Sequence, residues 1–267
     1  AASCSPSRAG LLTGKYPPRT GVNSVFFPES HTGLDPSEIT LAEIFKTQNY
    51  TTGIIGKWHL GHFEKFLPLV QGFDHYFGIP YSNDMKSVVY MRGNEVESYN
   101  VDQSLITKTY TDEAKKFIVE NKEHPFFLFL SHNMPHVPIY ASKKFKGKSI
   151  RGLYGDVIEE LDWSVGEILS TLKSLNILDN SLIIFTSDNG PWLSMKQLGG
   201  SAGILREGKR HTFEGGMRVP MIAMWPAKID KELVSNSVSS QLDFLPTIKK
   251  ILNLNLNGIE DGKDLFN

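Results

Sequence analysis

The sequence predicts an α/β fold with a mostly parallel central sheet flanked by helices. Four short runs rich in β-branched and aromatic residues are typical of buried strands, and helical patterns lie between them along the chain. Strands that alternate with helices in this way favour layered α/β architectures. The composition agrees, because 40% of the 267 residues are hydrophobic and 21% are charged, which supplies enough apolar material for a sizeable core.

The expected elements follow in chain order. A helix is expected to begin just after Cys4, with Pro6 suited to its first turn and Gly14 to its end. The strand candidates are 51–55, 126–131, 182–187 and 219–225. The helix candidates are 36–47, with Ser37 as the N-cap, 109–121, 155–175 and 240–252.

The helix expected over 155–175 carries the clearest pattern. Its apolar residues recur at steps of three and four, so they form one stripe, and the acidic residues fall elsewhere on its surface. The members of the stripe are Val157, Ile158, Leu161, Val165, Ile168, Leu169 and Leu172. This helix is therefore expected to pack one face against the sheet.

Charge and composition exclude several classes of function. The 28 basic and 29 acidic residues give a net charge of -1, so the chain has no long-range attraction for nucleic acid or for an anionic bilayer. No apolar run approaches the roughly 18 residues that a membrane span requires. We therefore expect no nucleic-acid partner and no membrane span in this segment. Cys4 is the one cysteine, which excludes an intrachain disulfide.

Polar groups follow three of the four expected strands directly. Lys57 and His59 follow the first strand, His132 and His136 follow the second, and the pair 188–189 follows the third. Ligands of open α/β folds bind at the carboxyl ends of the strands. We therefore expect these groups to meet in one site.

Each of these groups also has an ordinary structural explanation. A lone cysteine is usually a small buried residue, and a lysine or histidine in a loop is usually solvated. The four-residue spacing of His132 and His136 would suit zinc on a helix, but nearby prolines argue against a helix, and His132 is expected to be a hydrogen-bonded loop residue. Asp188 and Asn189 fit a turn, although their oxygens are also the hard ligands that Ca²⁺ or Mg²⁺ prefers.

The first segment resolves this ambiguity through a resemblance. The string Cys-Ser-Pro-Ser-Arg-Ala-Gly-Leu-Leu-Thr-Gly, residues 4–14, resembles the signature of the sulfatase family at every fixed position. Four further segments are similar to the family, in the family's order: 56–61 with 78–84, 135–138, 187–191 and 205–220. The resemblance covers about four fifths of the chain and implies an alkaline-phosphatase-like layered fold.

The resemblance also implies a role for each matching residue. Cys4 is implied to be the precursor of formylglycine, whose hydrated aldehyde is the nucleophile, and Arg8 is implied to hold it in place. Lys57 and Lys209 would contact the sulfate, His59 the hydrate, Ser82 and His136 the substrate. Asp188 and Asn189 would bind Ca²⁺, with Mg²⁺ as the alternative ion. Glu214 and Arg218 are expected only to brace the loop that holds Lys209.

This set of groups suits the hydrolysis of a sulfate monoester. That reaction requires neutralised oxygens, a nucleophile and a proton for the departing alcohol. Cations would clamp the oxygens, and His136 would protonate the leaving oxygen. His59 would assist the second hydroxyl of the hydrate in expelling sulfate, an exit that an ordinary serine lacks.

The resemblance further implies that the chain is part of a longer sulfatase catalytic domain. Family members carry two more metal-binding aspartates on a strand upstream of the cysteine, and they continue into a small C-terminal subdomain. Over residues 1–267 we therefore expect a domain truncated at its N-terminus and at its C-terminus, which binds calcium poorly by itself. The alternatives are a phosphate or phosphonate monoester hydrolase of the same superfamily, or an inactive truncated scaffold.

Partners and location are implied by the family alone. The expected partners are a sulfated small molecule or sulfated glycan and a formylglycine-generating maturation enzyme. The expected location is the periplasm, the cell exterior or the lysosome. The substrate alcohol is contacted by variable loops, so its identity cannot be read from these motifs.

Overall fold

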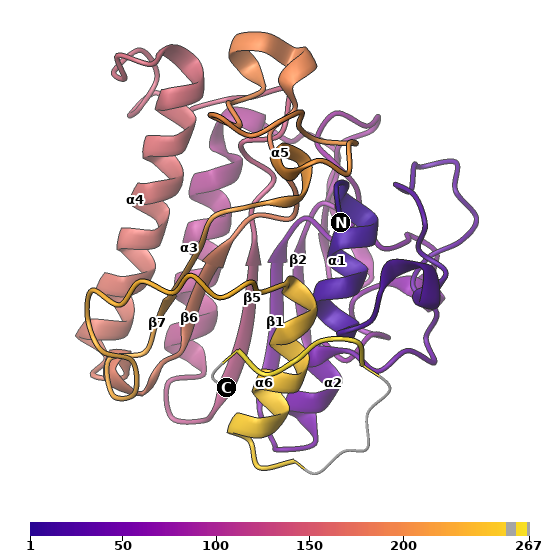
Figure 1. Cartoon of the computed structure of the whole chain (residues 1–267), viewed down its shortest axis with the longest axis vertical. Coiled ribbons are helices and arrows are strands. Elements are labelled where there is room, and N and C mark those ends of the chain that lie inside the picture. The colour runs from indigo at the N-terminus through magenta and orange to yellow at the C-terminus, as the bar shows by residue number, and fades with distance from the viewer. Residues whose placement is uncertain (255–259, 266–267) are drawn as a thin grey trace.

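The computed structural model describes residues 1–254 and 260–265 and shows a layered α/β fold (Figure 1). A five-stranded sheet has the order β4-β3-β2-β1-β5, and β6 and β7 form a separate pair. The strands are β1 (Thr51–Gly56), β2 (His75–Gly78), β3 (Tyr90–Arg92), β4 (Glu95–Ser98), β5 (Phe126–Ser131), β6 (Ile183–Thr186) and β7 (Met221–Met224). The centre of the sheet is parallel, since β1 pairs in parallel with both β2 and β5, whereas the β2–β3, β3–β4 and β6–β7 pairs are antiparallel.

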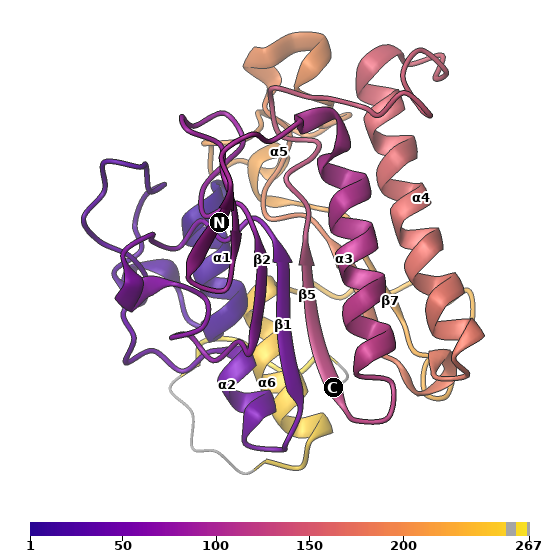
Figure 2. The same cartoon turned by 180° about the vertical axis from the view of Figure 1, so that it is seen from behind.

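Helices cover both faces of the sheet, with α1, α2 and α6 on one side and α3 and α4 on the other (Figures 1 and 2). The α-helices are α1 (Cys4–Thr13), α2 (Leu41–Lys46), α3 (Ile106–Glu120), α4 (Gly152–Ser174), α5 (Glu214–Met217) and α6 (Phe244–Ile251). Short 3-10 turns lie at Pro17–Thr20, Glu64–Phe66, Gln103–Leu105, Leu178–Asn180, Leu193–Leu198 and Gln241–Asp243.

The alternation of side chains along β5 explains this two-sided burial. Phe127 and Phe129 pack into the core beneath α1, α2 and α6. Leu128 and Leu130 point the other way and pack beneath α3. A strand that is apolar on both faces needs helices on both faces, which is why the run of phenylalanines and leucines favoured an α/β fold.

The structure confirms the four expected strands and the four expected longer helices, with shifts of a few residues at their ends. The N-cap prediction at Ser37 is wrong. The helix begins at Leu41 behind Thr40, whose hydroxyl accepts from the Glu43 amide while the Glu43 carboxylate accepts from the Thr40 amide. That reciprocal capping box satisfies two amides that Ser37 cannot reach. Strands β2, β3 and β4 were not predicted, because three or four residues are too few to show a period.

An internal cavity separates β5 from β6. Each of the two strands has a hydrogen-bonded partner on one side only, and their other edges face a cavity of about 1470 Å³. Side chains of both strands line it, and at its carboxyl end it reaches Lys57, Asp188 and Lys209. Among the described helices, none combines the length and the apolar character that crossing a membrane requires.

Candidate active site

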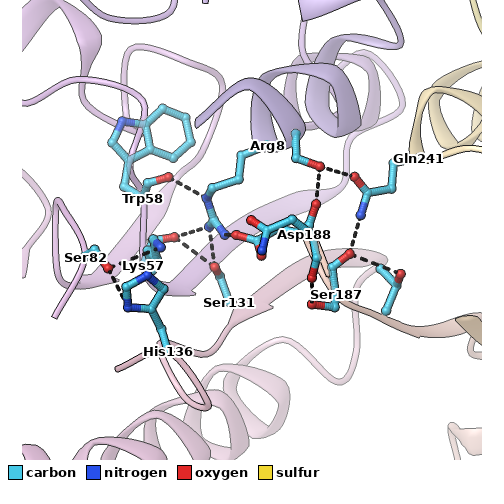
Figure 3. Close-up of polar contacts among 12 residues, drawn as sticks. Arg8, Lys57, Trp58, Ser82, Ser131, His136, Ser187, Asp188 and Gln241 are labelled. Carbon is cyan, nitrogen blue, oxygen red and sulfur yellow. Dashed lines mark hydrogen bonds and ion pairs between the residues drawn. The ribbon is translucent and has the colours of Figure 1, made fainter. Parts of the chain in front are cut away.

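The helix α1 brings the segment 4–14 to the carboxyl ends of β1 and β5. It begins at Cys4, which is buried, and ends at Gly14, whose φ of 66° places it in the left-handed region that glycine favours. Arg8 lies one turn after Cys4 and is 5% exposed. Its guanidinium donates to the carbonyls of Lys57 and Trp58 and to the Ser131 hydroxyl, as Figure 3 shows. Arg8 therefore ties the helix to both strand ends.

Lys57 directly follows β1, and hydrogen bonds to Ser131 hold both its amide and its carbonyl. Its amide donates to the Ser131 carbonyl at 2.7 Å, and its carbonyl accepts from the Ser131 hydroxyl at 2.8 Å. The Lys57 ammonium is buried and lies 3.5 Å from the Ser82 hydroxyl oxygen. A buried cation is stabilised by an anion, so Lys57 is suited to bind one.

His59 has one ring nitrogen bonded and one free. Its Nε2 lies 2.9 Å from the Phe26 carbonyl oxygen, so that nitrogen carries the proton and Nδ1 is an acceptor. The Nδ1 atom is buried and has no hydrogen-bond partner. Burial and then the Lys57 charge lower the pKa of His59 well below its usual value, so the ring is neutral at pH 7. An unpartnered basic nitrogen can accept a proton from a bound hydroxyl.

His136 lies opposite Lys57 in the loop after β5. Its Nδ1 donates to its neighbour's carbonyl, that of Val137, at 2.6 Å and lies 3.3 Å from the Ser82 oxygen. Asn83 holds this loop, because its amide nitrogen donates to the carbonyls of His136 and Pro138. Lys57, Ser82 and His136 therefore form one contiguous polar group (Figure 3).

The cations around His136 set its protonation. Burial and the charges of Lys57 and Lys209 lower the pKa of His136 to about 4, against an opposing effect of Asp84, whose carboxylate lies 3.8 Å from Nδ1. A bound anion that neutralises the two lysines acts in the opposite direction and favours the protonated imidazole. The site thus links the charge of His136 to anion binding.

Asp188 and Asn189 follow β6 and approach α1 from the other side of the cavity. The Asp188 carboxylate lies 3.8 Å from the Arg8 guanidinium. Burial opposes its ionisation, but the charges of Lys57, Arg8 and Lys209 together hold the pKa of Asp188 below its usual value. Ser7 contacts the Asp188 carbonyl and the Gln241 side chain, which fixes the turn against α1 and the segment before α6 (Figure 3).

The side-chain oxygens of Asp188 and Asn189 are donors of the type that a hard divalent cation binds. The Asn189 Oδ1 atom is buried and has no hydrogen-bond partner, and the neighbouring carboxylate is ionised. They supply two oxygen donors, whereas Ca²⁺ takes six to eight. Within residues 1–254 and 260–265, no group of three or more acidic, histidine or cysteine side chains is placed to hold a metal. The described residues therefore form part of a cation site.

Lys209 closes the site from the segment before α5. It is 7% exposed, and its amide donates to the Pro191 carbonyl at 2.8 Å, which fastens its loop to the turn that follows Asn189. Its ammonium lies 5.0 Å from the centre of the Trp192 ring. Arg218 and Glu214 pair with each other at 3.4 Å, and both are exposed, so they lie outside this polar group.

Sequence reasoning missed several residues that shape the site. Ser131, Asn83, Gln241 and Trp192 position the expected side chains through contacts between segments far apart in the chain. A single sequence gives no signal for such contacts. His132 bonds to Ser164 at 3.1 Å and takes no part in the site, as expected.

Comparisons with known proteins show the family to which the chain belongs. The sequence model of the family described as Sulfatase matches residues 1–254. The chain belongs to the sulfatase family. It is 42% identical to N-acetylgalactosamine-6-sulfatase of Mus musculus and 35% identical to arylsulfatase A of Homo sapiens, in each case over 98% of this chain. Those matches cover 56% and 57% of the two relatives, so the chain spans a little over half of their length.

Solved structures support the same assignment. A structure from a study of the metabolism of multiple glycosaminoglycans by Bacteroides thetaiotaomicron has a TM-score of 0.91 at 30% identity and covers all of this sulfatase chain and 71% of its own. Phosphonate monoester hydrolase from Silicibacter pomeroyi has a TM-score of 0.73 at 17% identity over 99% of this chain and 66% of its own. The second likeness, at this low identity, shows a shared fold alone.

Proposed function

We propose that this sulfatase hydrolyses sulfate monoesters to an alcohol and inorganic sulfate, with Cys4 converted to formylglycine. The observation that carries the proposal is the convergence of Lys57, His136 and Lys209 beside the start of α1. Two buried lysines supply the charge that a sulfate group requires. The family relatives named sulfatases support the same reaction.

The remaining residues of the group take the other roles. His136 would give a proton to the departing oxygen, and its protonated form is favoured when an anion neutralises Lys57 and Lys209. The free Nδ1 of His59 would accept a proton from a hydroxyl of the formylglycine hydrate. Ser82 lies between Lys57 and His136, within reach of a group bound to both. Arg8 holds the strand ends that carry Lys57 and Ser131.

A divalent cation at Asp188 and Asn189 would polarise the sulfate oxygens and add to the charge of the lysines. The ion is proposed to be Ca²⁺, with Mg²⁺ as the alternative, because the donors are a carboxylate and an amide oxygen. The formylglycine hydrate would supply the nucleophile that no unmodified side chain of the group provides. Because Cys4 is 2% exposed, a maturation enzyme would have to act before the chain folds.

The substrate is proposed to be a sulfated small molecule or a sulfated glycan. The relatives named N-acetylgalactosamine-6-sulfatase and arylsulfatase A differ in the alcohol they release, so family membership leaves this choice to the loops around the sulfate site. The protein is expected to act in the periplasm, outside the cell or in the lysosome. No specific observation favours phosphate or phosphonate esters, or a scaffold without activity.

Mass spectrometry of the Cys4 peptide, combined with kinetics, tests the proposal. Protein purified from its native host should carry the aldehyde or its hydrate at position 4 and should cleave aryl sulfates. The variant Cys4→Ala, made in the protein as its native host produces it, should lose activity by several orders of magnitude. Its circular dichroism should stay unchanged. A plain thiol in fully active protein, or an active Cys4→Ala variant, would contradict the proposal.

A further inference from the structure

Trp192 lies beside the polar group of Lys57, Ser82 and His136, and none of the roles proposed above involves it. It follows the turn of Asp188 and Asn189 and is half-buried. Its ring lies 5.6 Å from the ring of His136, and the Lys209 ammonium lies 5.0 Å from the ring centre. An indole thus borders two of the side chains proposed to contact the sulfate ester. The alcohol of an ester held by both side chains would lie close to this indole.

The backbone holds Trp192 firmly in this position. Its amide donates to the Gly199 carbonyl at 2.9 Å, and its carbonyl accepts from the Met195 amide at 2.9 Å. The preceding residue, Pro191, accepts from the Lys209 amide. A side chain with two rotatable bonds on a fixed backbone presents a rigid apolar surface at a small entropic cost. Such a surface stacks well against the C–H face of a sugar ring.

Arg210 places a cation over the same indole ring. Its guanidinium carbon lies 4.7 Å from the centre of the Trp192 ring, and the residue is exposed. Its φ of 77° lies in the left-handed region, and its amide donates to the carbonyl of Ala2, two residues before Cys4. Within the described part of the chain, the guanidinium makes no hydrogen bond and no ion pair, so its five donors are available to a ligand.

We propose that Trp192 and Arg210 form an acidic-sugar subsite next to the sulfate pocket. Trp192 would stack on the ring of a sulfated saccharide, and Arg210 would bind a second anionic group, a carboxylate or a further sulfate, on that ring or on its neighbour. This inference rests on the proposed function, because it concerns the alcohol of the same ester. A simple aryl sulfate has no second anion, so Arg210 separates acidic saccharides from simple aryl esters.

The test compares a sulfated disaccharide that carries a carboxylate with its methyl ester. The mature, metal-loaded protein should prefer the acidic form, and Arg210→Ala should lower the ratio of the two kcat/KM values by about tenfold, which is the loss of one charge-assisted hydrogen bond. The matched control is Arg206→Ala. Arg206 is an exposed arginine in the same segment that stacks on Phe213 at 3.8 Å, and its removal should leave the ratio unchanged.

Inhibition separates the subsite from the sulfate pocket. The desulfated acidic disaccharide probes the subsite, so Arg210→Ala and Trp192→Ala should each raise its inhibition constant. Inorganic sulfate probes the pocket, and Arg210→Ala should raise its inhibition constant much less. Equal increases for both inhibitors, or an unchanged kcat/KM ratio, would overturn the proposed subsite. Failure of the mature protein without any substitution to cleave any sulfate ester would instead overturn the proposed function.

Discussion

Arg8 shows how one buried side chain sets the geometry of the whole site. Burial lowers the pKa of its guanidinium, and the Asp188 carboxylate offsets part of this effect. Its hydrogen bonds go to the backbone of Lys57 and Trp58 and to Ser131. Within the described residues none of them goes to Cys4, so Arg8 holds the loops around that position and does not bind its side chain directly. The role implied by the resemblance, holding the modified residue in place, stays a prediction.

His132 provides a prediction at the residue scale. Burial lowers the pKa of His132 to about 4, compared with 6.5 for an unfolded chain. Between these values the unfolded state binds more protons, so the free energy of unfolding should fall as the pH drops from 6.5 toward 4 and should be fully retained above 6.5. The shift corresponds to at most roughly 3 kcal/mol.

Urea denaturation at several pH values measures this contribution. His132→Gln keeps a partner for Ser164 and should reduce the loss of stability between pH 6.5 and 4, with some loss remaining because His59 and His136 are also held neutral. The control is His124→Gln, at an exposed position. If His132→Gln and His124→Gln show the same pH dependence, His132 is not buried in its neutral form.

Asn189 provides a second prediction. Its Oδ1 atom is buried without a partner, whereas its Nδ2 donates to the Gly190 carbonyl at 3.0 Å. Asn189→Ala therefore removes one unsatisfied acceptor and one hydrogen bond, which offset each other, and should change the melting temperature of the metal-free protein only slightly. The same change should weaken Ca²⁺ binding at least about tenfold, as loss of metal-supporting groups generally does. Calorimetric titration of the longer form of the protein with Ca²⁺ checks this. An unchanged affinity would place the cation elsewhere.

At the scale of elements, the end of β1 is built around Gly56. Its φ is 117°, and a Cβ atom there would lie 1.9 Å from the Ser131 carbonyl oxygen of β5. The two residues are register partners at the point where both strands end. Only glycine allows this approach, and it brings Lys57 and Ser131 together beneath Arg8.

Gly56→Ala should therefore separate β1 from β5 at the site. We expect a loss of at least about 3 kcal/mol in the free energy of unfolding, from backbone strain and the clash together. Gly147→Ala is the matched control, because Gly147 also has a positive φ, 76°, but nothing lies within 4 Å of its Cβ position. It should lose only about 1 to 2 kcal/mol. Similar losses in chemical denaturation for both variants would show that the clash is relieved.

The elements also show which parts of the fold can be predicted from one sequence. Long patterns such as that of α4 and the apolar run of β5 carry enough repeats to be recognised. The start of α2 was misplaced although Thr40 and Glu43 form a recognisable Thr-x-x-Glu pattern. Strand β4 lies at the edge of the sheet and is largely exposed, and its neighbour β3 buries only Met91, so neither shows a buried face in the sequence. Their position depends on β2, which a local pattern cannot show.

At the scale of the molecule, the same limit applies to the site. The strand ends were recognised because parallel strands place their carboxyl ends together. Asn83 and Gln241 were not recognised, because each acts on a loop that is more than fifty residues away in the chain. A role for Trp192 was not recognised either, because that role depends on its contacts with three charged or titratable side chains, those of His136, Lys209 and Arg210.

The sequence did not predict the cavity between β5 and β6. Parallel strands are normally buried on both faces and paired on both edges. Here β5 pairs only with β1, and β6 only with β7. We propose that this space holds the upstream strand that the family resemblance implies, and that this strand adds ligands to the cation site beside Asp188. The apolar lining and the unpaired edges support this proposal.

Hydrogen–deuterium exchange compares the 267-residue chain with a longer form that begins upstream of it. In the longer form, the amides of β5 that face the cavity would donate to the added strand and should exchange slowly, whereas in the shorter chain they have no acceptor and should exchange orders of magnitude faster. The peptide over β1 is the internal control, because β1 is paired on both sides and should be protected in both forms. Equal protection of β5 in the two forms would show that no strand enters the cavity. In that case, the remaining ligands of the cation would have to come from another part of the molecule.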